Sequence, residues 1–371
     1  MESKNINPVK VYFFGPGAMG KIAYERWSGY APNDLQLVGY ISTRRGAGET
    51  YNGLPIVRPE AVEKDATVVI TLGYQQVKEA YAELTRCGIR DIRRFLGLTY
   101  AGENVEFLRD ECIELHEVDK ATLPYVEMHV VDHCNLNCRG CSHFSPTFPK
   151  EFPNLNKRLE DVVLLKEKLS GIMMFRVLGG EPFLHPELAD FLRKVRGLLP
   201  NTDLRIASNG LLVPSISDEI LEVIAQNRII VDITEYRPTR QMIDKITNRL
   251  IDKNIRYSLS GYDAKQKFNK PLSVSVDSKY EHFCLSYDCV NIYEGKIAMC
   301  ARLMFVNQIN QKFGTNFPTD GIMSLKDCPS RENLLQALQT DVPLCRHCIK
   351  NSIEWESCGK EAVLEDFVVL D

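Results

Sequence analysis

Cysteine spacing is the feature that most constrains this chain. Twelve cysteines occur among 371 residues, and nine of them fall in three short stretches at 134–141, 284–300 and 345–358. Gaps of two or three residues let one turn present several sulfurs to one metal centre. The first ten residues lack the apolar core of a signal peptide. We therefore expect a cytoplasmic protein whose cysteines are thiols or metal ligands, not disulfides.

The first hundred residues alternate between predicted strands and helices. Apolar runs at 9–15, 35–43 and 66–73 have the length of buried strands, and helix-like stretches separate them. Alternation of this kind is typical of parallel βαβ units. We therefore predict a Rossmann-like α/β domain over 1–99, followed by a charged linker at 100–122.

The alternation resumes after the linker. Five further strands are predicted at 125–132, 174–180, 203–208, 229–236 and 255–261, with amphipathic helices between them. This rhythm predicts a partial (β/α)6 TIM-type barrel over 123–275, with its chemistry at the C-terminal strand ends. The remaining residues, 276–371, form short segments and cysteine pairs, which predict a small α+β cysteine-rich module.

The first cysteine run directly follows a predicted barrel strand. Cys134, Cys138 and Cys141 have the spacing C-x3-C-x2-C. Three thiolates hold three irons of a cubane and leave the fourth iron open, whereas ferredoxin-type clusters use four cysteines. A zinc site with His133 or His143 as fourth ligand is the alternative.

On these residues the chain resembles the radical S-adenosylmethionine (SAM) superfamily. The resemblance spans roughly 125–262 and implies a [4Fe–4S] cluster whose open iron binds SAM, and a 5′-deoxyadenosyl radical that abstracts a substrate hydrogen. It also implies an external reductant such as flavodoxin or ferredoxin. One departure is Gly140, where the family usually has an aromatic residue; His143 or Phe144 is then expected to cover the adenine.

Three further stretches match the family in the expected order. Gly179-Gly180-Glu181-Pro182 is similar to the GGE motif, which binds the methionine amino group of SAM. Its glycines suit a close backbone approach, and its carboxylate suits an ammonium group. Ser208 and Asn209 lie where the family contacts the ribose or carboxylate. Ser260 and Gly261 lie where it packs the adenine.

The C-terminal cysteines resemble the twitch module of the same superfamily, a shortened relative of SPASM. The resemblance implies an auxiliary [4Fe–4S] cluster on Cys284, Cys300, Cys345 and Cys348. A hairpin predicted at Glu294-Gly295 places Cys289 opposite Cys300, which makes Cys289 a rival of Cys284. Cys358 is either a replacement ligand or a bystander, and a structural zinc ribbon is the alternative for the whole module.

Cys289 has a second possible role. In related sugar epimerases a cysteine returns a hydrogen atom to the substrate, and the resemblance makes Cys289 a candidate catalytic residue of this kind. The alternative is the packing of a small buried side chain.

The N-terminal glycines predict a phosphate site. Gly15, Gly17 and Gly20 form G-x-G-x-x-G between a predicted strand and a helix, which directs backbone N–H groups toward a phosphate. The second strand ends in Ser42-Thr43-Arg44-Arg45, without the acidic residue of NAD-binding proteins. The segment is also similar to small domains of sugar acyltransferases, which bind nucleotide-sugars. A domain used only for packing is the alternative.

Charge and domain composition favour a small-molecule substrate. The net charge is −4 with both signs interspersed, so we expect no nucleic-acid partner and no membrane partner. The predicted function is hydrogen abstraction from a carbohydrate-like or nucleotide-linked substrate, giving dehydrogenation or epimerisation, with Glu235, Tyr236 and Arg237 as candidate contacts. The alternatives are a radical SAM peptide maturase and a non-catalytic metal-binding or redox-sensing protein.

Overall fold

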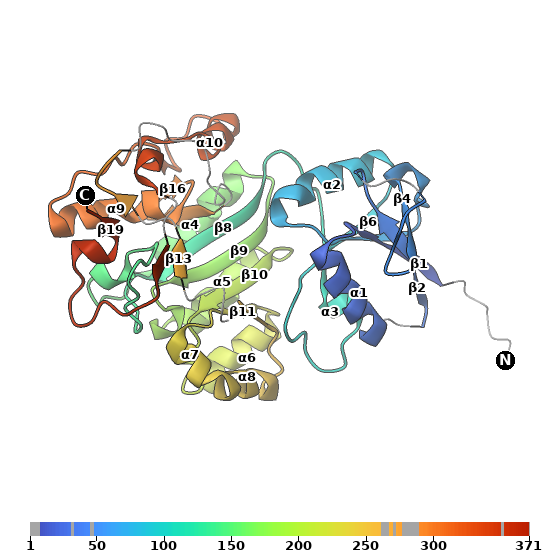
Figure 1. Cartoon of the computed structure of the whole chain (residues 1–371), viewed down its shortest axis with the longest axis horizontal. Coiled ribbons are helices and arrows are strands. Elements are labelled where there is room, and N and C mark those ends of the chain that lie inside the picture. The colour runs from blue at the N-terminus through green and yellow to red at the C-terminus, as the bar shows by residue number, and fades with distance from the viewer. Residues whose placement is uncertain are drawn as a thin grey trace. The chain divides into compact units, whose positions relative to one another are not determined.

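A computed structural model describes residues 8–30, 33–44, 48–260, 267–269, 272–276, 289–349 and 352–370. The chain divides into two compact units, Met1–Pro124 and Tyr125–Asp371. Figure 1 shows the first unit in blue to cyan and the second in green to red.

The first unit is built on a seven-stranded sheet with the order β3-β4-β2-β1-β5-β6-β7. Parallel pairing joins β4, β2, β1, β5 and β6, whereas the edge strands β3 and β7 pair antiparallel. The strands are β1 (Val9–Phe14), β2 (Leu35–Ile41), β3 (Thr50–Tyr51), β4 (Leu54–Val57), β5 (Thr67–Ile70), β6 (Asp91–Phe95) and β7 (Cys112–Glu114).

Helices cover both faces of this sheet. α1 (Ala18–Tyr30) and the short α3 (Phe107–Asp110) lie on one face, and α2 (Tyr74–Arg86) lies on the other (Figure 1). β1 leads through α1 to β2, and β5 leads through α2 to β6, in opposite directions along the sheet. Because such crossovers are right-handed, this strand order puts the two helices on opposite faces.

The segment expected as a linker belongs to the first unit. Phe107 is fully buried, and its ring lies 5.6 Å from that of Phe13 and 5.2 Å from that of Trp27. Cys112 begins the edge strand β7 and is buried in the same core. The linker prediction was wrong because charged residues surround these few apolar positions, so the segment shows no periodicity.

The second unit is built on an eight-stranded sheet with the order β12-β11-β10-β9-β8-β15-β16-β17. All five strands predicted after the linker are present. They are β8 (Thr122–Val131), β9 (Gly171–Gly179), β10 (Asp203–Ser208), β11 (Ile230–Ile233) and β12 (Tyr257–Leu259). β9 to β12 pair parallel in sequence order, so the carboxyl ends of these strands meet at one edge of the sheet.

Amphipathic helices connect these strands. α4 packs on α5 and α5 on α6, so they form a layer beside the sheet. Asn154 and Ser217 cap α4 and α6 through their side-chain oxygens. The helices are α4 (Leu155–Lys168), α5 (Leu188–Leu198), α6 (Asp218–Gln226), α7 (Arg237–Gln241), α8 (Ile243–Asp252), α9 (Ala301–Phe313) and α10 (Arg331–Leu338).

The cysteine-rich C-terminal region shares the large sheet. β15 (Val290–Tyr293) pairs parallel with β8, and the hairpin continues through β16 (Lys296–Ala298) to β17 (Met323–Ser324). The predicted turn at Glu294-Gly295 is confirmed, because both residues have positive φ, 49° and 72°. The boundary expected at residue 275 therefore does not divide two compact units.

Two small sheets complete the second unit. β13 (Lys267–Asn269) pairs with β18 (Ser352–Glu354), and β14 (Leu272–Ser273) pairs with β19 (Val368–Val369). Among the helices in the described ranges, none has the length and apolar composition needed to cross a lipid bilayer.

The burial of Phe107 gives a test of the revised domain boundary. Phe107→Ala should lower the free energy of unfolding of the first unit by about 3–5 kcal/mol, because it leaves a cavity among three aromatic rings. Chemical denaturation of the full chain measures this loss. Ile22→Ala, at an exposed position of the same unit, is the matched control. A loss below about 1 kcal/mol for Phe107→Ala would restore the linker interpretation.

Candidate cluster site

The three cysteines of the first run lie together in the loop that follows β8. Cys138 is buried, and Cys134 and Cys141 pack around the same small apolar cluster. The loop turns tightly because Asn137 and Gly140 both have positive φ, 48° and 73°. The backbone conformation at position 140 therefore explains the glycine there, since an aromatic residue with this positive φ would be strained.

The two glycines of the GGEP motif allow β9 to end against this loop. A Cβ atom on Gly179 would lie 1.9 Å from the carbonyl oxygen of Val131, and one on Gly180 would lie 1.9 Å from that of His133. Gly180 N donates to Val131 O (2.8 Å), and Glu181 N donates to His133 O (3.2 Å). The glycines are therefore required for contact between two backbone segments of the protein.

Glu181 connects the motif to the end of β10. Its carboxylate is fully buried and accepts hydrogen bonds from Ser208 Oγ (2.8 Å), Asn209 N (2.9 Å) and Phe183 N (3.2 Å). Burial raises the pKa of Glu181 to about 7. The carboxylate thus ties the motif to the end of β10, and its expected contact with an ammonium group stays a prediction. Pro182, also buried, follows it.

Asn209 carries this network to the first cysteine. Its Nδ2 donates to Asn135 Oδ1 (2.7 Å) and lies 3.6 Å from Cys134 Sγ. Ser208, Asn209 and Glu181 are therefore brought together with the cysteine loop, as the motif order predicted. Their expected contacts with SAM stay a prediction.

The donor set fits an iron–sulfur cluster better than zinc. In the described part of the chain, Cys134, Cys138 and Cys141 do not hold their three sulfurs within 4.8 Å of one another. Tetrahedral zinc, with Zn–S bonds of about 2.3 Å, needs sulfurs about 3.8 Å apart. The irons of a cubane occupy different corners and need more widely spread thiolates. His143, a candidate zinc ligand, lies 3.4 Å from Glu127 Oε2 and also interacts with Cys141, and both contacts contribute to raising its pKa to about 9.

A C-terminal segment that sequence reasoning missed covers the cysteine loop. We call residues 355–367 the C-terminal strap. Trp355 belongs to the apolar cluster around Leu136 and Cys138, and the strap pairs with the loop as an isolated antiparallel bridge, Cys138 with Ser357. Its backbone hydrogen bonds to the loop are Arg139 N to Glu356 O (2.7 Å), Cys358 N to Asn137 O (2.8 Å) and Gly140 N to Asp366 O (2.7 Å).

The strap also settles the surroundings of Cys358. Because its N–H bonds to Asn137, this cysteine lies beside the first cysteine run, and the charge of Cys141 contributes to raising its pKa to about 12, after burial and Asp366. Of the two predicted roles for Cys358, a replacement auxiliary ligand or a bystander, this position beside the first cysteine run favours the bystander.

The remaining predicted auxiliary ligands are only partly described. Cys300 caps the start of α9, where its sulfur accepts from Leu303 N (3.5 Å). Burial raises the pKa of Cys300 to about 12, and the neighbouring Cys348 and Cys345 contribute to that rise. Cys284 lies outside the described residues. Continuing the hairpin register places Cys289 opposite Cys300.

Most of the side chains predicted to contact the substrate or the adenine interact with other protein residues in this structure. Glu235 is buried and pairs with Arg240 (2.9 Å), and Tyr236 packs on Trp355 with ring centroids 5.8 Å apart. Arg237 begins α7 and is exposed. Ser260 accepts from Glu235 N (3.1 Å), and Gly261 lies outside the described residues.

Two of the three N-terminal glycines, Gly15 and Gly17, line a pocket of about 430 Å³. Gly15 has φ 119°, and a Cβ on Gly20 would lie 2.3 Å from Gly15 O, so both serve the packing of the strand–helix turn. Gly17 has open space beside it. Polar lining comes from Ser42, Thr43, Arg44, Gln76, Glu79 and Glu83.

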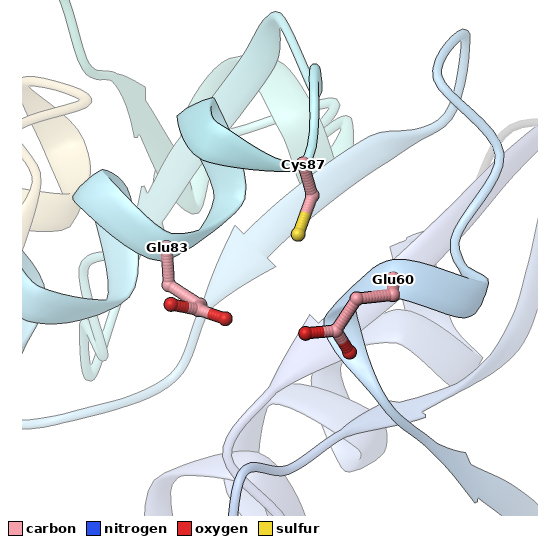
Figure 2. A group of neighbouring side chains, drawn as sticks. All are labelled: Glu60, Glu83 and Cys87. Carbon is pink, nitrogen blue, oxygen red and sulfur yellow. The ribbon is translucent and has the colours of Figure 1, made fainter.

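A second group of possible ligands lies on the first unit. Figure 2 shows Glu60, Glu83 and Cys87, whose ligand atoms lie within 4.8 Å of one another. Arg86 is paired with Glu83 (2.5 Å) and lies 3.9 Å from Glu60. Because the arginine already compensates these surface carboxylates, the group is an ion-pair network and not a metal site.

Comparison with known families agrees with this geometry. Residues 128–260 match the family model described as the Radical SAM superfamily. The matched residues include the cysteine loop, the GGEP motif and the end of β10, so this part of the chain is similar to a radical SAM domain, which implies a [4Fe–4S] cluster and SAM as cofactors.

Curated relatives match over part of their length. The chain is similar to the GTP 3′,8-cyclase of Microcystis aeruginosa, with 26% identity over 164 residues, covering 42% of this chain and 47% of the relative. It is also similar to the GTP 3′,8-cyclase of Lactiplantibacillus plantarum, with 27% identity over 172 residues, covering 44% and 46%. The chain thus spans less than half of these relatives.

Solved structures show a more distant likeness. BtrN in complex with AdoMet and 2-DOIA has a TM-score of 0.36 and 14% identity, covering 60% of this chain and 92% of BtrN. Streptococcus suis SuiB bound to precursor peptide SuiA has a TM-score of 0.33 and 11% identity, covering 60% and 66%.

The contact between Gly180 and the cysteine loop predicts a specific loss. Gly180→Ala should prevent the loop from closing, because its Cβ would lie 1.9 Å from His133 O and 2.7 Å from Cys134 N. After anaerobic reconstitution the variant should hold about four fewer irons per chain, the content of one cluster. Gly197→Ala, with no atom within 4 Å, is the control. Full iron content in Gly180→Ala would contradict this account.

Proposed function

We propose that this enzyme abstracts a hydrogen atom from a carbohydrate-like or nucleotide-linked substrate and so catalyses its dehydrogenation or epimerisation. When bound, the cluster and SAM supply the 5′-deoxyadenosyl radical for that step. Cys134, Cys138 and Cys141 would hold the cluster, and Gly179, Gly180, Glu181, Pro182, Ser208 and Asn209 would shape the SAM site.

A pocket of the second unit, lined mainly by residues of the β15–β16 hairpin and α9, is the observation that carries this proposal. Its volume is about 680 Å³. Tyr293, which lines it, donates its hydroxyl to Asp132 Oδ2 (2.8 Å), two residues before Cys134. Phe148, on the opposite side of the cysteine loop in sequence, also lines it. One lining residue thus follows the proposed cluster ligands in sequence, and another is hydrogen-bonded to a residue that precedes them.

The chemistry of the pocket suits a sugar-like ligand. Aromatic rings offer flat apolar faces, and amides with both donor and acceptor atoms suit hydroxyl groups. Both kinds are present together with one cation and one anion. The lining residues are Phe148, Tyr293, Glu294, Lys296, Met304, Phe305, Asn307, Gln308, Thr319, Ile322 and Ser324.

One face of the large sheet is also strongly polar. Arg176 on β9 pairs with Asp232 on β11 (2.7 Å), and Arg205 on β10 reaches the same aspartate (3.0 Å). Glu127 on β8 bonds to Asn291 on β15 (3.3 Å). Charged side chains on a sheet face favour a polar substrate over an apolar one.

Two observations support a nucleotide-linked form of the substrate. The N-terminal pocket combines the open Gly17 backbone with Arg44, a pair that suits a phosphate. The curated relatives are named for GTP, which is a nucleotide with a ribose. Their names describe a cyclisation, so GTP belongs in the test alongside nucleotide-sugars.

We further propose an auxiliary [4Fe–4S] cluster on Cys284, Cys300, Cys345 and Cys348. The influence of Cys345 and Cys348 on the pKa of Cys300, together with the hydrogen bond from Cys348 N to Cys345 O (3.1 Å), supports it. Cys300→Ala combined with Cys348→Ala should remove about four irons per chain and leave the cluster of the first loop in place. Iron analysis of the reconstituted protein measures this, with Cys87→Ala as control. An unchanged iron content would remove the auxiliary cluster from the proposal.

The substrate class is tested by anaerobic formation of 5′-deoxyadenosine from SAM and a reductant such as flavodoxin or ferredoxin. Nucleotide-sugars, amino-cyclitols, GTP and peptides are compared, with Cys134→Ala as the inactive control. We expect nucleotide-sugars or amino-cyclitols to accelerate formation. Acceleration by peptides alone would make the enzyme a peptide maturase, and no formation by iron-loaded protein would favour a metal-binding or redox-sensing role.

Two variants sharpen this assay. Asn307→Leu should raise the KM for the accelerating substrate about tenfold, the cost of roughly 1.4 kcal/mol of lost polar contact, without changing substrate-free formation. Gln311→Leu, exposed on the same helix and outside the pocket, is the control.

If Cys289 returns a hydrogen atom, Cys289→Ala should still form 5′-deoxyadenosine but yield no epimerised product. An unchanged yield of epimerised product would exclude that role.

A further inference from the structure

The side chain of Trp355 makes an unusual contact with a proposed cluster ligand. Its indole Nε1–H donates to Cys138 Sγ at 3.1 Å, across 217 residues of sequence. Trp355 is 8% exposed, and its ring rests against that of Tyr236. The indole ring is therefore held by protein contacts and is largely shielded from solvent.

This contact has a definite chemical sense. An indole nitrogen donates and never accepts, so its buried N–H requires an acceptor. Leaving it without one would cost about 1–3 kcal/mol. A thiolate that ligates iron carries negative charge and is a stronger acceptor than a neutral thiol. The bond to Cys138 therefore becomes stronger when the cysteine holds the cluster.

The backbone of the strap also forms hydrogen bonds with the loop. Residues 137, 139 and 140 each form one backbone hydrogen bond with the strap. Arg139 adds ion pairs to Glu356 (3.4 Å) and Asp366 (3.5 Å). Below the loop, the ring of Phe144 meets that of Phe367 edge-on at 5.7 Å. The strap thus contacts the loop at residues 137–140 and again at Phe144.

We propose that the C-terminal strap is part of the cluster site, and that Trp355 is a positioning residue that raises the reduction potential of the cluster through Cys138. This inference rests on the proposed cluster ligands and is independent of the substrate class. One-electron reduction of the cluster by the external reductant adds negative charge to its sulfur ligands. A hydrogen bond to one of these sulfurs stabilises the reduced form more than the oxidised form.

The test is a reductive titration of the reconstituted full-length protein, followed by electron paramagnetic resonance. The cluster of the first loop is identified as the one whose signal changes when SAM is added. In Trp355→Phe the ratio of reduced to oxidised cluster at a fixed potential should fall three- to tenfold. Tenfold corresponds to a shift of about 59 mV for one electron. Trp27→Phe, which replaces the second of the two tryptophans, should titrate like the wild type.

Iron content separates the possible outcomes. Trp355→Phe with a full iron complement and the wild-type potential would overturn the role of the N–H group. If this variant fails to hold its cluster, Trp355→His decides, since imidazole supplies an N–H donor in place of indole. A histidine variant that loads iron and titrates near the wild type supports the proposal, and one that titrates far lower or loads no iron overturns it. Absence of a SAM-responsive signal in the wild type would overturn the cluster assignment itself.

Discussion

The site depends on one close approach between two backbones. β9 ends against the carbonyl oxygens of Val131 and His133, and side chains larger than hydrogen at positions 179 and 180 would prevent this. The approach fixes where the cysteine loop begins and aims Glu181 at the end of β10. The relative positions of the cysteine loop, the GGEP motif and the end of β10 thus depend on the absence of two Cβ atoms.

The sequence-based prediction succeeded where information was local. Apolar runs identified every strand from β8 to β12, and positive φ at Glu294 and Gly295 bears out the predicted hairpin. The short spacing of Cys134, Cys138 and Cys141 predicted that they share one turn, and the structure has all three in one loop. In each case the pattern lies within ten or so residues, so backbone preferences and burial determine the outcome without help from distant segments.

The prediction failed where the decisive partner is far along the chain. Trp355 has no periodic neighbours and no motif, and its partner Cys138 lies 217 residues earlier. The burial of Phe107 was not predicted, because the charged residues around it leave no periodic apolar pattern. Long-range packing of this kind leaves no local signal in a single sequence.

The strap has a consequence for how the protein is made. The cysteine loop leaves the ribosome 217 residues before Trp355 does. At a synthesis rate of about 5–20 residues per second, the loop exists for roughly 10–40 seconds without its covering segment. During that interval the loop lacks three backbone hydrogen bonds, and the Cys138 sulfur lacks its indole donor. The nascent chain therefore offers a more open loop to the machinery that delivers iron and sulfide than the finished protein does.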